Sequence, residues 1–319
     1  MNKGLEYMKL IEDLQLISEP FVNAVVTIGN FDGVHNGHRA LIQNTIDKAR
    51  SIQGTSVAIT FEPHPIKVLT NSSPPPLITI YEQKVELIEK TGIDVLVAIP
   101  FTLDFAGMEA RAFVEELLVR QIGMKAIVVG NDYAFGKDRE GNLDLLRQYA
   151  QDLDFEVIVP DWINTPEGED RISSTLIREM IRKGDVKTVR HYLGRHYQIR
   201  GKVGAGRNRG GKLPGFPTAN ITLKDELCPE TGVYAVTVNC SHGIFKGVAN
   251  IGFSPTFDDH LFTVEVHILD FNHDIYNQDI RVNMIEKLRD EKKFNGIDEL
   301  STQIRKDVEK ARSILENIG

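Results

Sequence analysis

The chain has 319 residues, a length that predicts two domains. Of these residues 41% are hydrophobic and 26% charged, a composition typical of a folded globular protein. No apolar run approaches the length needed to cross a bilayer, so we expect no membrane span and no membrane partner. The net charge of −8 argues against nucleic acid as a partner, because nucleic-acid-binding proteins present a basic surface, but it still allows a small nucleotide substrate.

The N-terminal segment, MNKGLEYMKLIEDLQ, mixes acidic with apolar residues and lacks the uninterrupted apolar core of a secretory signal. We therefore expect a cytoplasmic protein, acting as a monomer or weak homo-oligomer. The two cysteines, Cys228 and Cys240, are too few and too widely spaced for a zinc knuckle. A structural disulfide is not expected in a reducing compartment, so we predict two buried or half-buried thiols.

From about Asn23 to Pro160, short β-rich runs alternate with amphipathic helical stretches. The β-rich runs are residues 24–29, 55–60, 93–100, 125–130 and 155–160, and the helical stretches are residues 38–50, 81–90, 109–121 and 142–151. This alternation predicts an α/β fold, a Rossmann-like domain with a doubly wound parallel sheet. Ligands of such sheets bind at the carboxyl ends of the strands.

After Arg171 the pattern changes, and residues 173–194 predict two short helices separated by Gly184 and Asp185. We interpret this helix pair as the hinge into a second domain. The predicted domains are residues 1–184 and 185–319.

Strand-like runs parted by Gly, Pro, Asn and Asp follow from His196 onward, with no helix between them. The runs are residues 196–203, 216–223, 232–239, 244–252, 261–271 and 275–284. Successive strands without crossover helices predict a small antiparallel β-barrel. The amphipathic residues 298–318 predict a C-terminal helix that covers one face or mouth of this barrel.

The first strand leads into NFDGVHNGHRAL, where glycines allow tight turns and His35 and His38 stand at the start of a helix. A helix N-terminus offers free N–H groups and a positive dipole end, which suit a polyphosphate. Two imidazoles there can donate to phosphate oxygens and stabilise charge on a leaving pyrophosphate. An isolated pair would more often be capping or surface histidines, and zinc lacks a third ligand nearby. The position after a strand and a Gly-rich turn favours nucleotidyl transfer.

Four motifs of this half resemble one family. TIGNFDGVHNGHRALI is similar to the H-x-G-H signature of nucleotidyltransferases, and RISSTLIRE resembles the I-S-S-T-x-I-R motif of bacterial FAD synthetases. TFEPHP (60–65) and VVGNDYAFGKDREGN (128–142) also match that family. The resemblance implies that ATP and its phosphates contact Gly29, Phe31, Gly33, His35, His38, Ser174, Thr175 and Arg178, with His35, His38 and Arg178 as catalytic residues.

Each of these residues also has a simpler interpretation. Ser174 and Thr175 could cap the next helix instead of binding phosphate, and Arg178 could form a surface salt bridge. The resemblance implies flavin contacts for Pro63, His64, Pro65, Asn131 and Asp132. His64 could equally be a turn residue, and which of Asn131 and Asp132 meets substrate stays open.

In the second half, GRNRGGKL (206–213) comes within one residue of a Walker A phosphate loop. Leu213 stands where Ser or Thr should hold Mg²⁺. Pro214 and Pro217 follow at once and the chain enters a strand, so the helix that a Walker loop requires cannot begin there. The Walker interpretation therefore fails.

The same stretch, running into GFPTAN, resembles the phosphate loop of riboflavin kinases, as do GVANIGFSPTF (247–257) and TVEVHILDF (263–271). The resemblance implies that Thr218 and Asn220 hold Mg²⁺ and ATP phosphates and that Glu265 is the general base. It further implies ATP contacts for Gly204, Lys212 and Pro217. Lys212 stands where the family commonly has Arg, and Asn277 where it has Gly; Asn tolerates the left-handed conformation better than most residues.

Together these motifs resemble the bacterial bifunctional riboflavin kinase/FAD synthetases over nearly the whole chain. The resemblance implies that riboflavin is phosphorylated by ATP to FMN, which is then adenylylated by ATP to FAD, with Mg²⁺ as cofactor. Two alternatives remain: an adenylyltransferase of another substrate with a vestigial barrel, and a flavin-binding regulator without catalysis.

Overall fold

The computed structural model describes residues 7–70, 76–165, 168, 171–204, 216–223, 225–253 and 262–316. By their internal contacts two compact units form, one from Met1–Pro75 and Thr79–Ser173, the other from Pro76–Ile78 and Ser174–Gly319. The domain boundary predicted at 184/185 lies inside the second unit. Across the described residues, no helix is both long and apolar enough to span a membrane.

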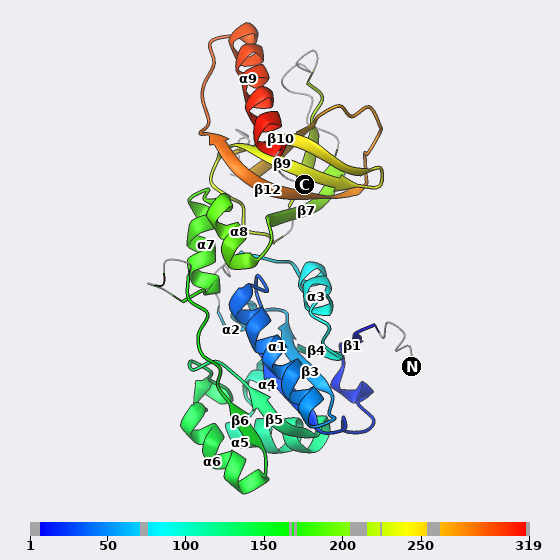
Figure 1. Ribbon diagram of the computed structural model, residues 1–319, viewed down its shortest axis with the longest axis vertical. Coiled ribbons are helices and arrows are strands. Elements are labelled where there is room, and N and C mark those ends of the chain that lie inside the picture. The colour runs from blue at the N-terminus through cyan, green and yellow to red at the C-terminus, as the bar shows by residue number, and fades with distance from the viewer. Residues whose placement is uncertain are drawn as a thin grey trace. The chain divides into compact units, whose positions relative to one another are not determined.

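The first unit is built on a parallel sheet whose order, among the described residues, is β1-β4-β3-β2-β5-β6 (Figure 1). The strands are β1 (Lys9–Ile11), β2 (Ala24–Ile28), β3 (Ser56–Glu62), β4 (Val95–Pro100), β5 (Met124–Val128) and β6 (Glu156–Ile158). This confirms the predicted doubly wound sheet. The strand order reverses between β2 and β5, so the loops after these two strands diverge and leave room for a ligand.

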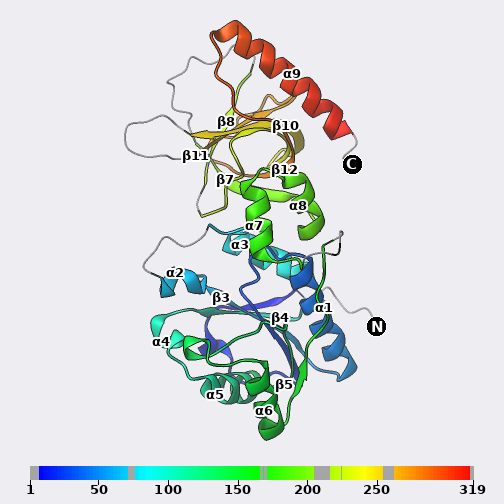
Figure 2. The same cartoon turned by 90° about the vertical axis from the view of Figure 1, so that its left-hand side faces the viewer.

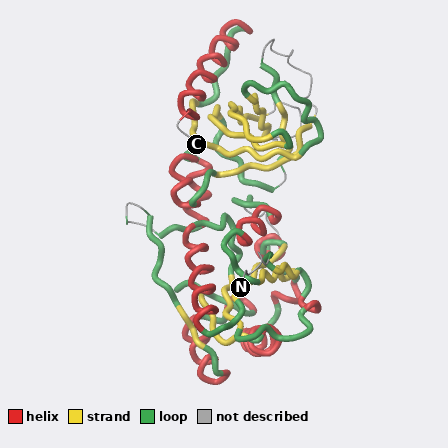
Figure 3. Tube along the Cα trace, turned by 45° about the vertical axis from the view of Figure 1, so that its right-hand side comes forward, coloured by secondary structure: helices red, strands yellow, loops and turns green. Residues whose placement is uncertain are grey.

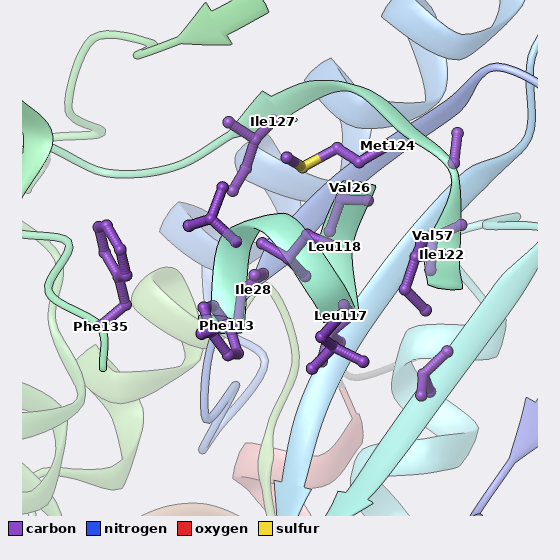
Figure 4. Packing of buried hydrophobic residues seen from close by; sticks show 14 of the residues in the cluster. Val26, Ile28, Val57, Phe113, Leu117, Leu118, Ile122, Met124, Ile127 and Phe135 are labelled. Carbon is purple, nitrogen blue, oxygen red and sulfur yellow. The ribbon is translucent and has the colours of Figure 1, made fainter. Parts of the chain in front are cut away.

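Helices cover both faces of this sheet, and Figure 3 shows them in red around the yellow strands. They are α1 (Asn36–Ser51), α2 (Pro65–Leu69), α3 (Tyr81–Glu89), α4 (Leu103–Ala106), α5 (Ala110–Ala112), the π-helical η2 (Phe113–Ile122) and α6 (Leu143–Leu153), with short 3₁₀ turns η1 (Leu14–Leu16) and η3 (Lys137–Arg139). On one face α1 and α3 pack through Ile42, Ile46 and Ile88. On the other, η2 packs through Leu117 and Leu118 against β2 and β3 (Figure 4).

The central strands are mostly apolar because both of their faces are covered. All five residues of β2 are buried, with Val26 in the cluster on the η2 side and Val25 in the one with α1. No side chain of β2 is therefore exposed to a ligand along the length of the strand. Ligand contacts are therefore restricted to the ends of the strands and the loops that follow them.

In the second unit, α7 (Ser174–Arg182) and α8 (Val186–Leu193) precede a closed antiparallel barrel with the order β10-β11-β8-β7-β12-β9. The strands are β7 (Tyr197–Gly204), β8 (Ala219–Thr222), β9 (Gly232–Cys240), β10 (Gly243–Phe253), β11 (Phe262–Ile268) and β12 (Asp279–Arg289), and α9 (Ile297–Glu316) follows. This confirms the predicted barrel and C-terminal helix. Cys228 and Cys240 are free and half-buried, as predicted, and burial raises the pKa of the Cys228 thiol to about 12.

The segment Pro76–Ile78 belongs to the second unit, although it lies far from the rest of that unit in sequence. Leu77 forms a parallel bridge with Glu226: its N–H donates to the Asp225 carbonyl at 2.9 Å, and its carbonyl accepts from Leu227 N–H at 2.8 Å. Leu77 and Leu227 are both buried. The chain therefore passes between the units at residues 75/76, 78/79 and 173/174.

Helix α9 covers one face of the barrel, as Figure 2 shows. Ala311 and Leu315 pack in one apolar cluster with Val233, Val248 and Ile285 of the strands. A buried ion pair adds to this contact: the Arg289 guanidinium donates to both carboxylate oxygens of Asp307, with distances of 2.8 to 3.1 Å. The side chains are 15% and 6% exposed, so water screens their attraction little.

We predict that Asp307→Ala lowers the free energy of unfolding of the barrel by about 3 kcal/mol, because it leaves the Arg289 charge buried without its partner. Urea unfolding followed by circular dichroism measures the change. The control Arg312→Ala removes the exposed pair that Arg312, on the same helix, forms with Asp270, and should leave the unfolding midpoint almost unchanged. Equal effects of the two substitutions would contradict the prediction.

Candidate active sites

The loop after β2 brings His35 and His38 together at the start of α1. His35 is the N-cap, and its Nδ1 accepts from the His38 backbone N–H at 3.3 Å. The two rings stack with centroids 3.6 Å apart and planes at 19°. Because Nδ1 of His35 accepts, its Nε2 carries the proton in the neutral ring.

This loop has a strained backbone. Phe31 and Val34 have φ of 48° and 39°, in the left-handed region that β-branched residues in particular avoid. Phe31 is fully buried: a Cβ added to Gly29 would lie 3.1 Å from its ring, and the His38 ring meets it edge-on at 5.3 Å. Backbone strain of this kind persists where the surroundings hold it, and it clusters at functional loops. The predicted contact of Phe31 with ATP stays a prediction.

His38 is uncharged at neutral pH in the free protein. Burial, and then the charges of His35 and Lys84, lower its pKa well below the ordinary value of 6.5. Its Nδ1 is buried and finds no hydrogen-bond partner within the part of the chain that the structure describes. Buried nitrogens normally have a partner, so the unpaired His38 Nδ1 is an exception of the kind found at functional sites.

The I-S-S-T motif begins beside this loop. Ile172 N–H donates to the Ile163 carbonyl at 3.0 Å, and the Ile172 carbonyl lies 3.6 Å from where a Cβ on Gly37 would stand. Ser174, Thr175 and Arg178 come next, on α7, which belongs to the second unit. Their phosphate contacts stay predictions.

The loop after β3 contains the predicted flavin residues Pro63, His64 and Pro65. His64 is buried and caps α2, with its Nδ1 accepting from Ile66 N–H at 3.3 Å, while Pro63 is exposed. The capping role is the turn function considered for His64 from the sequence. Nothing in this geometry conflicts with a ligand on the exposed side of the loop.

Asn131 and Asp132 follow β5, beside the point where the strand order reverses, and both are exposed. Asp132 Oδ2 accepts from Arg171 Nη2 at 2.7 Å, and the Arg171 guanidinium lies 4.3 Å from the centre of the Trp162 ring. The Trp162 ring in turn would lie 3.2 Å from a Cβ on Gly130. Sequence reasoning missed Arg171 and Trp162, although Arg171 stands directly before the I-S-S-T motif.

Three more residues that sequence reasoning missed lie at the carboxyl ends of β3 and β4 and on α4, which follows β4. Phe61, Phe101 and Phe105 are half-buried, and their ring centroids lie 5.5 to 5.9 Å apart. Such a cluster offers an apolar, aromatic surface to a flat ring system. The sequence signal was present in the phenylalanines that directly follow two predicted strands.

In the second unit, the barrel register aligns the predicted kinase residues. Asn220 on β8 pairs with Glu265 on β11 and with Gly204 on β7, and Glu265 pairs in turn with Asn250 on β10. Directly paired residues project from the same face of a sheet. Val264 and Val266 are fully buried inside the barrel, so Glu265 and its asparagine neighbours face outward, half-buried.

Thr218 directly precedes β8, two residues before Asn220, and it is exposed. The Pro217 carbonyl between β8 and the preceding loop accepts from His267 Nδ1 at 2.8 Å, which fixes the start of the strand. A hydroxyl and an amide oxygen suit Mg²⁺, which takes further oxygens from water and phosphate. In the described residues no group of three His, Cys, Asp or Glu side chains could hold a metal, so any ion here depends on such ligands.

Three further residues are relevant to the barrel: Asn277, Lys212 and Glu291. Asn277 has φ of 62°, so it adopts the left-handed conformation expected where the family has glycine. Lys212 lies outside the described residues, as does most of the glycine-rich loop around it. A carboxylate oxygen of Glu291 would lie 2.4 Å from a Cβ on Gly252, the next outward position after Asn250 on β10.

Comparison with known proteins assigns both units. Residues 18–176 match the family model described as FAD synthetase, and residues 193–315 the model described as riboflavin kinase. Bifunctional riboflavin kinase/FMN adenylyltransferases are similar over nearly their whole length: those of Haemophilus influenzae (36% identical, 97% of this chain and 100% of the relative), Escherichia coli K12 (36%, 96% and 97%) and Listeria monocytogenes (37%, 93% and 94%). This chain belongs to that family.

One solved structure shares the fold of this chain. A crystal structure described as a macrolide-efflux protein from Streptococcus pneumoniae is 32% identical, with a TM-score of 0.86, and the match covers 96% of this chain and 99% of that one. Family membership confirms the resemblance drawn from the motifs.

We predict that His38 makes the first unit less stable in acid. Below its ordinary pKa of 6.5 the unfolded chain binds a proton that the folded chain does not, so folding is disfavoured as pH falls from about 7 to about 5. Replacement by Gln should flatten this dependence. Urea unfolding followed by the fluorescence of Trp162, the only tryptophan, measures it.

His242→Gln serves as the control, because it replaces an exposed histidine of the barrel. It should leave the pH dependence of the Trp162 transition unchanged. An equally steep loss of stability in the His38→Gln protein would contradict the assignment.

Proposed function

We propose that this chain phosphorylates riboflavin to FMN in its barrel and adenylylates FMN to FAD in its parallel-sheet unit, using ATP for both reactions. One observation carries the proposal: the unit matched to each activity brings two of the motif residues for that activity together. His35 stacks on His38 in the first unit, and Glu265 pairs with Asn220 across strands in the second. We place these reactions in the cytoplasm, in a monomer or weak homo-oligomer.

In the kinase step, the terminal ribityl hydroxyl oxygen attacks the γ-phosphorus of ATP, the bond to the β,γ-bridging oxygen breaks, and ADP leaves. Glu265 accepts the hydroxyl proton, and its place beside Asn220 puts the base next to the phosphate-binding side chains. Thr218 and Asn220 would hold Mg²⁺, which offsets the charge of the phosphate oxygens. Gly204, Lys212 and Pro217 complete the proposed ATP contacts.

In the adenylyl transfer, a phosphate oxygen of FMN attacks the α-phosphorus of ATP, the bond to the α,β-bridging oxygen breaks, and pyrophosphate leaves. His35 and His38 donate N–H groups to the phosphate oxygens. The N–H groups of Gly29 and Gly33 are already paired with the Ile59 carbonyl and Thr79 Oγ1, so the proposed ATP contacts of these glycines are close packing and not hydrogen bonds. We assign the same charge-stabilising role to Ser174, Thr175 and Arg178 of α7.

For the flavin of this second reaction we propose the open surface after β3, β4 and β5. Phe61, Phe101 and Phe105 supply an apolar surface for the flavin rings. Polar and turn residues border this surface: Pro63, His64, Pro65, Asn131 and Asp132.

The proposal predicts that the protein incubated with riboflavin, ATP and Mg²⁺ forms first FMN and then FAD, resolved by chromatography. Chelation of Mg²⁺ should lower both rates by at least about 100-fold, because the phosphate charges then lose their counterion. Absence of any turnover would favour a flavin-binding regulator, and FMN left unadenylylated would favour another adenylyl acceptor.

We further predict that the two activities separate by mutation. Glu265→Ala should lower kcat for riboflavin phosphorylation by about 10² to 10⁴-fold, as loss of a general base does, and leave FMN adenylylation intact. His38→Ala should do the reverse. Steady-state assays of both reactions on each protein measure this, and loss of both activities in either folded variant would refute two independent sites.

A further inference from the structure

Lys84, on α3 of the first unit, is a buried cation that no sequence motif singles out. It is 4% exposed. Burying an ammonium group is costly unless it is paired and hydrogen-bonded, so its surroundings should supply several oxygens. Burial lowers the pKa of Lys84, while the carboxylates of Glu62 and Asp32 act in the opposite direction.

The ammonium group meets oxygens from two adjacent strands. Lys84 Nζ lies 3.4 Å from the carbonyl oxygens of Asn30 and Phe61, 3.2 Å from Thr60 Oγ1 and 3.7 Å from Glu62 Oε2. Its three protons thus have three hydrogen-bond acceptors, and a carboxylate balances the charge. A network as complete as this holds its members in one arrangement.

These oxygens stand where two functional loops begin. Asn30 follows β2 and opens the turn that leads to His35 and His38, while Phe61 and Glu62 end β3 directly before Pro63. The two strands are parallel neighbours, with Ile28 paired to Ile59. One side chain therefore joins the start of the proposed nucleotide loop to the start of the proposed flavin loop.

A second contact from the same part of the chain supports this arrangement. Thr79, two residues before α3, donates its N–H to Asp32 Oδ1 at 3.0 Å, and its Oγ1 accepts from Gly33 N–H at 3.0 Å. Asp32 and Thr79 are both buried. Thr79, just before α3, thus hydrogen-bonds to the strained nucleotide loop, and Lys84, on α3, hydrogen-bonds both to the start of that loop and to β3.

We propose that Lys84 is a positioning residue for adenylyl transfer, holding the nucleotide and flavin loops at the separation at which FMN can attack ATP. The inference rests on the proposed function of this site. Lys84 acts through Asn30, Thr60 and Phe61 and contacts no reacting atom. Catalysis by alignment is sensitive to small displacements, since a shift of about 1 Å can cost about 100-fold in rate.

The test is the Lys84→Met protein, which keeps the length of the side chain and removes its charge. We expect kcat for FMN adenylylation to fall about 100-fold, with much smaller changes in KM for ATP and FMN. Riboflavin phosphorylation by the same sample should stay within about twofold of the unsubstituted protein, which verifies the second unit and the concentration. Lys84→Arg, which restores the charge, should recover part of the lost kcat.

Lys48→Met is the matched control: it makes the same chemical change in the same unit, at a residue paired with Glu156 on the surface, and should keep full activity. If Lys84→Met does not fold, Thr60→Val replaces it, because it removes one acceptor and keeps the lysine. A lowered melting temperature with unchanged kcat, in whichever variant folds, overturns the proposal. Failure of the unsubstituted protein to form FAD would instead refute the proposed function.

Discussion

The pairing of strand residues decides where this protein can do chemistry. In the parallel sheet both faces of the central strands are covered by helices, so every residue of β2 is buried and ligands can be met only at the strand ends. In the barrel one face is inside, where Val264 and Val266 are fully buried. Glu265 and its neighbours are therefore restricted to the outer face. The two proposed sites differ because the two sheets leave different positions open.

Much of this arrangement could be predicted from local sequence. The β-rich runs and amphipathic stretches of the first unit have the periods that two buried faces impose, and the motif around His35 and His38 is contiguous in sequence. The change at His196 from alternating elements to successive strands was sufficient to predict a barrel. These features depend on residues close together in the chain, which is where sequence patterns are informative.

Features that depend on distant pairing were not visible. The pairing of Asn220 with Glu265 joins residues that the sequence separates by 45 positions, and only the register aligns them. Lys84 lies on an ordinary amphipathic helix, and its pairing with the Asn30 carbonyl after β2 and the Phe61 carbonyl on β3 depends on the tertiary fold. The three-residue strand β1 is too short to show any period. Phe61 and Phe101 could have been noticed, but their contact required the parallel order of β3 and β4.

The bridge at Leu77 makes the second unit discontinuous in sequence, because Pro76–Ile78 belongs to it although the residues on both sides belong to the first unit. A barrel excised at Ser174 would leave the carbonyl of Asp225 and the N–H of Leu227 without the backbone partners they have in the whole chain. Buried backbone groups left unpaired are costly, so the completeness of the riboflavin kinase fold depends on three residues supplied from within the adenylyltransferase sequence. Thr79 follows Leu77 by two residues and hydrogen-bonds to Asp32 and Gly33 of the nucleotide loop. One short stretch of chain therefore supplies hydrogen bonds to both units.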